Sequence, residues 1–303
     1  MEKEYIYKIR SFSSCILAAY KLVSENAKAI FRCTWLPMLL YGISSGLYLT
    51  LNLRSSGITT FAEEHSYLYI ILWTLSFLGM MASYVWASAR LLSMLNGESR
   101  RWNVIRILLL GLCNLLVFVL FSAVVAGILY LWYRQTGGTL PEMLKDNWLI
   151  IGILCLVVTL LDLPFLYINT RYLFDREARF MPDLPKSYAT GLRHLGLLFI
   201  TALLLGLLLG MIFLITSLPF IVLVFANTMS TLGVLMGDPS GLPASFPLLH
   251  GGTFCLTAII WGYLSLFTII VWLFIYGSIE KQREERKTLI PTTHDTTFTD
   301  FEE

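Results

Sequence analysis

Residues 195–237 read LGLLFITALLLGLLLGMIFLITSLPFIVLVFANTMSTLGVLMG. This run of 43 residues contains no charged side chain and no histidine. A helix needs roughly 20 apolar residues to cross the ~30 Å hydrocarbon layer of a bilayer. The run therefore predicts at least one membrane-spanning helix, and the neighbouring segments show the same pattern.

Four more uncharged runs are long enough to span, namely 33–53, 66–89, 107–133 and 251–279. A sixth run, 147–170, is interrupted only by Asp162, and we count it as a span because leucine, isoleucine, valine and phenylalanine surround that carboxylate. Runs this long and continuous lack the alternation of barrel strands, so in lipid they must form helices. We predict an all-α membrane protein with six transmembrane helices in one domain, 33–279, whose fifth helix covers about 195–218.

The composition agrees with this class of protein. Apolar and aromatic residue types make up 56% of the chain and charged residues only 14%. A soluble domain has about 25% charged residues. The mean hydropathy is +0.70, and lipid is the solvent that accepts such a surface. The net charge of +2 is too small to imply a nucleic-acid partner.

The positions of the basic residues predict the orientation. With six spans, 19 of the 22 Lys and Arg residues fall on one face of the membrane and 3 on the other. The positive-inside rule then places both termini in the cytoplasm, and a bias this strong favours the bacterial cytoplasmic (inner) membrane. A seventh span, made by a hinge at Ser217–Pro219, would move the basic cluster 281–287 across the membrane. We therefore expect 220–249 to form an outer connection that either re-enters the membrane or lies along the headgroups.

The first 32 residues form a predicted cytoplasmic amphipathic helix. Apolar residues recur at steps of four and three, at Phe12, Ile16, Ala19, Val23, Ala27 and Ile30. This stripe either enters the headgroup boundary, where anionic lipid attracts the lysines, or docks on the helix bundle. Similar short helices are expected at 98–108 and 183–195. Residues 280–303 are expected to be a cytoplasmic tail, disordered where it becomes Thr-rich and acidic.

Three strings carry a family resemblance: SFSSCILAAYKLVSENAKAIFRCTWLP at 11–37, WASARLL at 86–92 and YINTRYLFD at 167–175. In these strings and in its layout the chain resembles bacterial six-span inner-membrane families of unknown function. These include the membrane domain attached to some glycerophosphodiester phosphodiesterases. The resemblance implies a membrane fold. The phosphodiesterase activity is not carried over to this chain, because the sequence shows no attached catalytic domain.

Two polar residues lie deep within predicted spans, Asp162 and Asn114. Asp162 precedes Arg171 by nine residues, or roughly 13 Å of helix. An ionised carboxylate at that depth costs on the order of 2.5–3.5 kcal/mol, so it requires a partner or a proton. With a helix break at Pro164 it would form a proton or cation site. Alternatively, it accepts a hydrogen bond from Asn114, Thr159 or Tyr167 and fixes helix packing, which is also the role expected for Asn114.

Arg90 and Arg171 end two spans and are candidate contacts for lipid headgroups. The four histidines fall in loop or interfacial positions, and no catalytic, cofactor-binding or metal-ligand pattern is present. The sequence therefore favours a non-enzymatic accessory, scaffold or lipid-contacting protein whose partners are membrane lipids and other membrane proteins. The alternative is a small transporter or channel that uses Asp162 and the break at Pro164.

Overall fold

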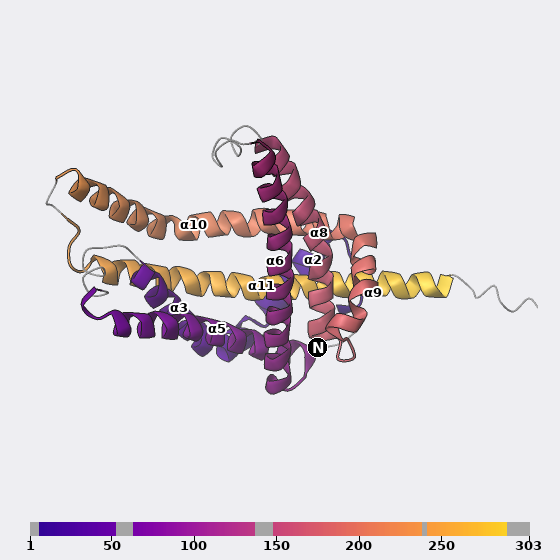
Figure 1. Ribbon diagram of the computed structural model, residues 1–303. Coiled ribbons are helices and arrows are strands. Elements are labelled where there is room, and N and C mark those ends of the chain that lie inside the picture. Colours follow the sequence, from indigo (N-terminus) through magenta and orange to yellow (C-terminus); the bar gives the residue numbers. More distant parts are fainter. Residues whose placement is uncertain (1–5, 53–62, 137–147, 238–240, 290–303) are drawn as a thin grey trace, which may run out of the picture.

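The computed structural model describes residues 6–52, 63–136, 148–237 and 241–289, and within them every regular element is a helix (Figure 1). The elements are α2 (Phe12–Glu25), α3 (Ala27–Asn52), α5 (Ser66–Asn96), α6 (Arg100–Thr136), α8 (Trp148–Phe174), α9 (Phe180–Arg193), α10 (Leu195–Leu235) and α11 (Phe246–Leu289). Four of them, α5, α6, α10 and α11, are long and apolar enough to cross a membrane. The prediction of an all-helical membrane protein is confirmed at this level. The helices α3 and α8 coincide with the other two predicted spans.

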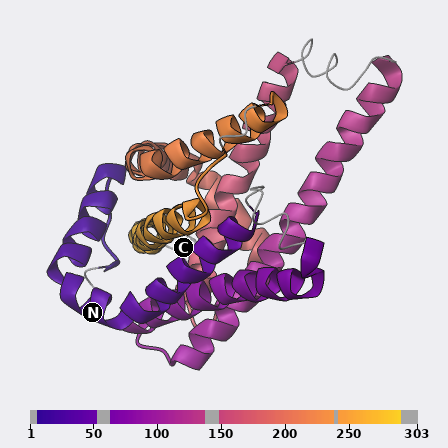
Figure 2. The same cartoon turned by 90° about the vertical axis from the view of Figure 1, so that its left-hand side faces the viewer.

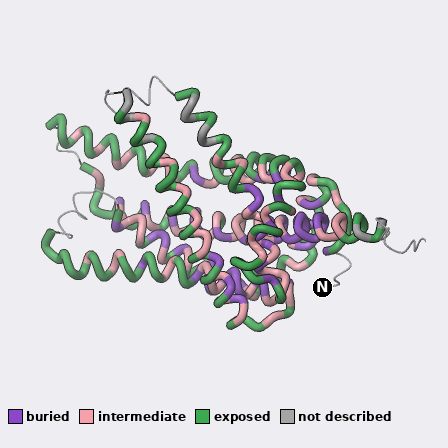
Figure 3. The backbone as a smooth tube through the Cα atoms, turned by 45° about the vertical axis from the view of Figure 1, so that its right-hand side comes forward, coloured by how far each residue is buried: buried purple, intermediate pink, exposed green. Residues whose placement is uncertain are grey.

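The long helices form three hairpins, α3–α5, α6–α8 and α10–α11, with α11 at the centre (Figures 1 and 2). Its stretch 270–279 is almost completely buried, with Val271 and Phe274 fully enclosed. The N-terminal segment crosses it there, since the Arg10 backbone N–H donates to Ser278 Oγ at 3.0 Å. Buried residues concentrate at this end of the molecule, whereas the far ends of the hairpins are largely exposed (Figure 3).

Small residues set the distance between α3 and α11. A Cβ added to Gly46 would lie 2.6 Å from the Gly251 carbonyl oxygen, and one added to Gly42 would lie 2.8 Å from the Cys255 carbonyl oxygen. The two glycines are four residues apart, so they lie on one face of α3 and let the two backbones approach closely. This is the small-residue packing that is typical of helices in lipid.

The predicted N-terminal helix 1–32 is wrong in its extent. It ends at Glu25, because the Asn26 backbone N–H and side-chain amide both donate to the Leu22 carbonyl, and α3 begins at Ala27. The buried face of α2 contains Cys15, Ala19 and Leu22 and packs mainly on α11. Helix α2 therefore docks on the helix bundle, which is one of the two alternatives predicted for it. The face that it buries is rotated about the helix axis relative to the predicted apolar stripe.

Two further boundaries differ from expectation. The segment 98–108 forms no separate helix, because α6 runs without interruption from Arg100. The predicted helix 183–195 is present as α9, which begins earlier, at Phe180. There the Asp183 carboxylate accepts a hydrogen bond from the Arg179 backbone N–H at 3.0 Å and stabilises the start of the helix.

The predicted fifth helix, about 195–218, ends too early, since part of the expected outer connection 220–249 is helical. Whether that segment re-enters the membrane or lies along the headgroups stays a prediction. Helix α10 continues through Pro219 to Leu235, changing direction along its length, and α11 begins at Phe246 (Figure 1). Similarly, α11 extends into the predicted tail as far as Leu289. Glu280 and Lys281 pair there with Arg283 and Glu284, each three residues later, which favours helix. The rest of the predicted tail, 290–303, lies outside the described residues.

Candidate functional site

A cavity of about 630 Å³ lies between α6 and α8, and it contains both of the predicted intramembrane polar residues. Asn114 lines it from α6 and Asp162 from α8. Most of the remaining wall is aliphatic or aromatic. The two helices pack sparsely against each other, which leaves room for the cavity. The phenyl ring of Phe118 on its wall is 68% exposed, so the cavity opens to the surroundings of the hairpin.

Asp162 is exposed on the cavity wall. No hydrogen bond or ion pair from the described part of the chain reaches its carboxylate. The hydroxyl of Tyr167, one of the three expected donors, instead donates to the Glu280 carboxylate on α11. Asn114 and Thr159, the other two, line the same cavity. The packing role expected for Asp162 therefore has no contact to support it among the described residues.

Asn169 is a further polar residue of the cavity, and sequence reasoning missed it. It follows Asp162 by seven residues and thus lies on the same face of α8. Its side-chain oxygen Oδ1 is buried and accepts no hydrogen bond from the described residues. A buried acceptor without a donor is unfavourable, and in a native protein it indicates a missing partner. The spacing of residues 162, 166 and 169, at steps of four and three, places them on one helix face and could have identified Asn169 from the sequence.

The predicted helix break at Pro164 is wrong, because α8 continues through it from Trp148 to Phe174. Helix α9 packs directly on this proline: a Cβ added to Gly191 would lie 2.9 Å from Pro164 Cα. The Tyr188 hydroxyl also donates to the Leu161 carbonyl at 3.0 Å, in the turn that the proline disturbs. Pro164 therefore marks the docking position of α9.

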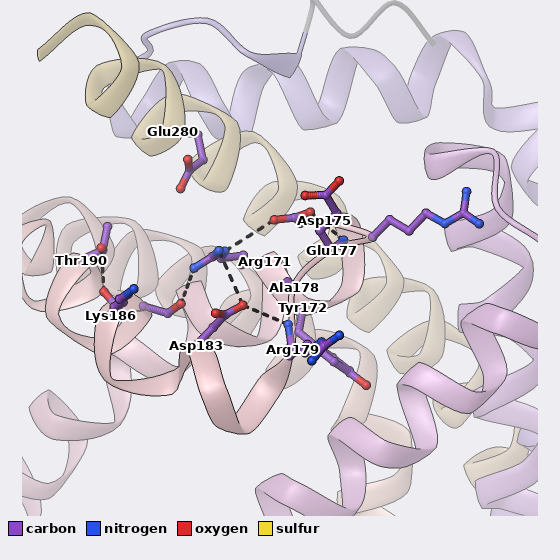
Figure 4. Close-up of polar contacts among 12 residues, drawn as sticks. Arg171, Tyr172, Asp175, Glu177, Ala178, Arg179, Asp183, Lys186, Thr190 and Glu280 are labelled. Carbon is purple, nitrogen blue, oxygen red and sulfur yellow. Dashed lines mark hydrogen bonds and ion pairs between the residues drawn. The ribbon is translucent and has the colours of Figure 1, made fainter. Parts of the chain in front are cut away.

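Arg171 joins α8 to α9 through several polar contacts (Figure 4). Its guanidinium lies 3.6 Å from Asp175 and 3.7 Å from Asp183, and it donates to Ser187 Oγ at 2.7 Å. The side chain is about one-fifth exposed. The described contacts thus occupy much of the guanidinium, and the headgroup role stays a prediction.

Arg90 also contacts the bundle. It donates to the Cys33 carbonyl on α3 at 2.8 Å, and its guanidinium carbon lies 4.7 Å from the ring centroid of Trp86. A headgroup contact by Arg90 likewise stays a prediction.

Arg106 fixes α6 to the turn between α8 and α9, a role that sequence reasoning missed. Its guanidinium donates to four carbonyls, those of Tyr172, Asp175, Arg176 and Ala178. It is also sandwiched between the rings of Trp102 and Tyr172, at 4.1 and 4.5 Å. The i, i+4 spacing of Trp102 and Arg106 weakly predicts that the two side chains contact each other on one helix face. The four carbonyl partners cannot be predicted from the sequence, because they meet Arg106 only in the folded structure.

The described residues contain no group of three or more potential metal ligands. His250, expected at a loop or interfacial position, is 1% exposed, with its ring 5.2 Å from that of Phe220. The α6–α8 cavity offers one carboxylate, amide and hydroxyl groups, and apolar walls. This set can bind and orient a molecule.

No family model, curated protein or solved structure matches this chain. The resemblance to the six-span membrane families therefore remains a prediction from the sequence.

Proposed function

We propose that the protein crosses the bacterial cytoplasmic membrane six times, with both termini in the cytoplasm. The distribution of charge on the fold supports this proposal. Helices α2 and α9 and the C-terminal part of α11 gather at one end of the molecule, opposite the far ends of the α3–α5 and α10–α11 hairpins (Figure 1). The basic segments 90–106, 171–193 and 281–287 belong to that same end.

Within the membrane, we propose that the protein is a non-enzymatic component that contacts lipid and holds a membrane-dissolved molecule between α6 and α8. The single observation that carries this proposal is the cavity, which is mostly apolar, holds a few polar groups and opens beside an exposed helix. Such a combination is typical of small-molecule binding sites. The exposed apolar faces of α6 and α10 also suit contact with other membrane proteins, which is the accessory or scaffold form of the same proposal.

The test is the amount of amphiphile that the protein retains. Purified protein released from lipid nanodiscs in a native mass spectrometer should keep a bound amphiphile. Ser122→Trp, which fills the cavity from α6, should lose it. Leu120→Trp is the matched control, because Leu120 is 59% exposed on the same helix and does not line the cavity. Equal retention by both variants would contradict the proposal.

A second candidate function is transport or conduction through Asp162. The observation that favours it is the exposed carboxylate without a described partner. Liposomes with wild-type protein would then move a solute or proton, and Asp162→Asn would abolish the flux. Glu177→Gln removes an acid that is exposed outside the cavity and should leave the flux intact. If the wild-type protein moves nothing by itself, the binding function stands and the transport function fails.

A further inference from the structure

We propose that the cavity between α6 and α8 is a binding site for a lipophilic cation, an amphiphile with one ammonium group and one apolar tail. The inference rests on the proposed lipid-contacting function and names the chemical class of its ligand. The ammonium lies against the Asp162 carboxylate, and the tail follows the apolar walls toward the open side at Phe118.

Charge is the first argument. Among the described residues that line the cavity, Asp162 is the only charged one. A carboxylate in a membrane-spanning segment is costly unless it is neutralised, and no described residue neutralises it. A bound cation would do so. Conversely, an anion would meet repulsion, and the phosphate of a two-chain phospholipid would find no Lys or Arg on the wall. The charge therefore selects a cation that carries no phosphate.

Hydrogen bonding points in the same direction. A primary ammonium has three N–H donors and no acceptor. One N–H group would donate to the Asp162 carboxylate, and the Asn114 side chain lines the same cavity from α6 as a further acceptor. Asn169 is seven residues, or roughly 10 Å of helix, from Asp162, so one nitrogen atom cannot bond to both side chains.

The walls suit the rest of such a molecule. Phe118 and Phe121 face the cavity from α6 and Phe165 from α8. Aromatic faces attract cations, most strongly where water is excluded, and they also pack on an alkyl chain. A volume of about 630 Å³ lies within the range of drug-sized ligand sites, which is the size class of a single-tailed amphiphile.

The experiment measures binding of dodecylammonium and dodecanol, which share a tail but differ in charge, at neutral pH. Full-length protein in phosphatidylcholine nanodiscs is dialysed against each radiolabelled ligand, and empty nanodiscs give the background from partitioning into lipid. We expect wild-type protein to bind dodecylammonium at least about tenfold more tightly than dodecanol, because an ion pair surrounded by hydrocarbon, where the dielectric constant is low, exceeds one factor of ten in affinity. Asp162→Asn should remove this preference, and Glu177→Gln should keep it.

Two tryptophan variants distinguish failure of the cation inference from failure of the proposed lipid-contacting function. Ser122→Trp should reduce binding of both ligands, whereas Leu120→Trp should not. If the two ligands bind wild-type protein equally and Ser122→Trp abolishes both, the lipid-contacting function stands and the cation inference is overturned. If neither ligand binds above the empty nanodiscs, both proposals fail. Displacement of dodecylammonium by added phosphatidylethanolamine would assign the site to a lipid headgroup and overturn the inference.

Folding of each variant is checked by circular dichroism and by elution as a single species. Should Asp162→Asn fail to fold, the comparison of the two ligands on wild-type protein and the effect of Ser122→Trp decide the matter. Equal affinities for the charged and uncharged ligands then refute the inference without any Asp162 variant.

Discussion

Replacing Gly46 by alanine tests how α3 and α11 are held together. The added Cβ would lie 2.6 Å from the Gly251 carbonyl oxygen and 3.1 Å from Cys255 Cβ. The first of these obstacles belongs to the backbone, so the two helices must shift apart. Extra methyl groups in a well-packed interface cost typically about 1–3 kcal/mol.

The matched control is Gly206→Ala on α10, where an added Cβ meets nothing within 4 Å. Both substitutions gain the same helix propensity, roughly 1 kcal/mol, so the difference between the two variants isolates the packing cost. At about 2–4 °C per kcal/mol, Gly46→Ala should unfold roughly 2–12 °C below Gly206→Ala. The measurement is thermal unfolding of the detergent-solubilised proteins. If Gly46→Ala unfolds at or above the temperature of Gly206→Ala, the close approach of α3 and α11 is incorrect.

Three further predictions concern the contacts of Arg106, Tyr188 and His194. Arg106→Lys should lower the stability by on the order of 3 kcal/mol, measured as a lower unfolding temperature, because lysine cannot donate to all four carbonyls. The control Arg176→Lys should have little effect on the unfolding temperature, because the Arg176 side chain is 76% exposed. Tyr188→Phe should lose about 1 kcal/mol with the hydroxyl that donates to Leu161, measured as increased proteolysis around α9. Burial lowers the pKa of His194 below its ordinary 6.5, so the unfolded state binds the proton more tightly than the folded state. The contribution of His194 to stability should therefore be complete above about pH 6.5 and be lost as the pH falls below that value. His194→Gln should remove this part of the pH dependence of the unfolding temperature.

The helices were predictable because lipid leaves a long uncharged segment few alternatives. Backbone groups in hydrocarbon must be paired within the segment, so the runs that begin near Ser66 and Leu195 became α5 and α10. The end of α10 was not predictable from the same rule. Pro219 is compatible with either a loop or a bent helix in lipid, and no charge occurs before Asp238 to mark an end.

The face of α2 shows a different limit of sequence reasoning. The predicted stripe included Ala19, which is fully enclosed, but it missed Cys15, Ala18 and Leu22, which are also buried. Small side chains let α2 approach α11 closely, whereas Ile16 lies at the edge of that contact. Hydropathy weighs size and apolarity, so it cannot identify an interface that depends on small volume.

The candidate site was predictable only in its parts. Asp162 and Asn114 were identified by their depth in apolar runs, but nothing in the sequence places them on one cavity. That depends on how α6 and α8 face each other in the fold. Asn169 was missed because an asparagine close to Arg171 and Asp175 reads as part of a polar helix end.

The side of the membrane on which each connection lies is the most direct test of the six-span arrangement. Single reporter fusions at both chain ends and after residues 97 and 177 should report the cytoplasm. Fusions at residues 58, 141 and 239 should report the opposite face. Chain ends on opposite faces, or both ends outside, would contradict the arrangement on which the cavity and its proposed ligand depend.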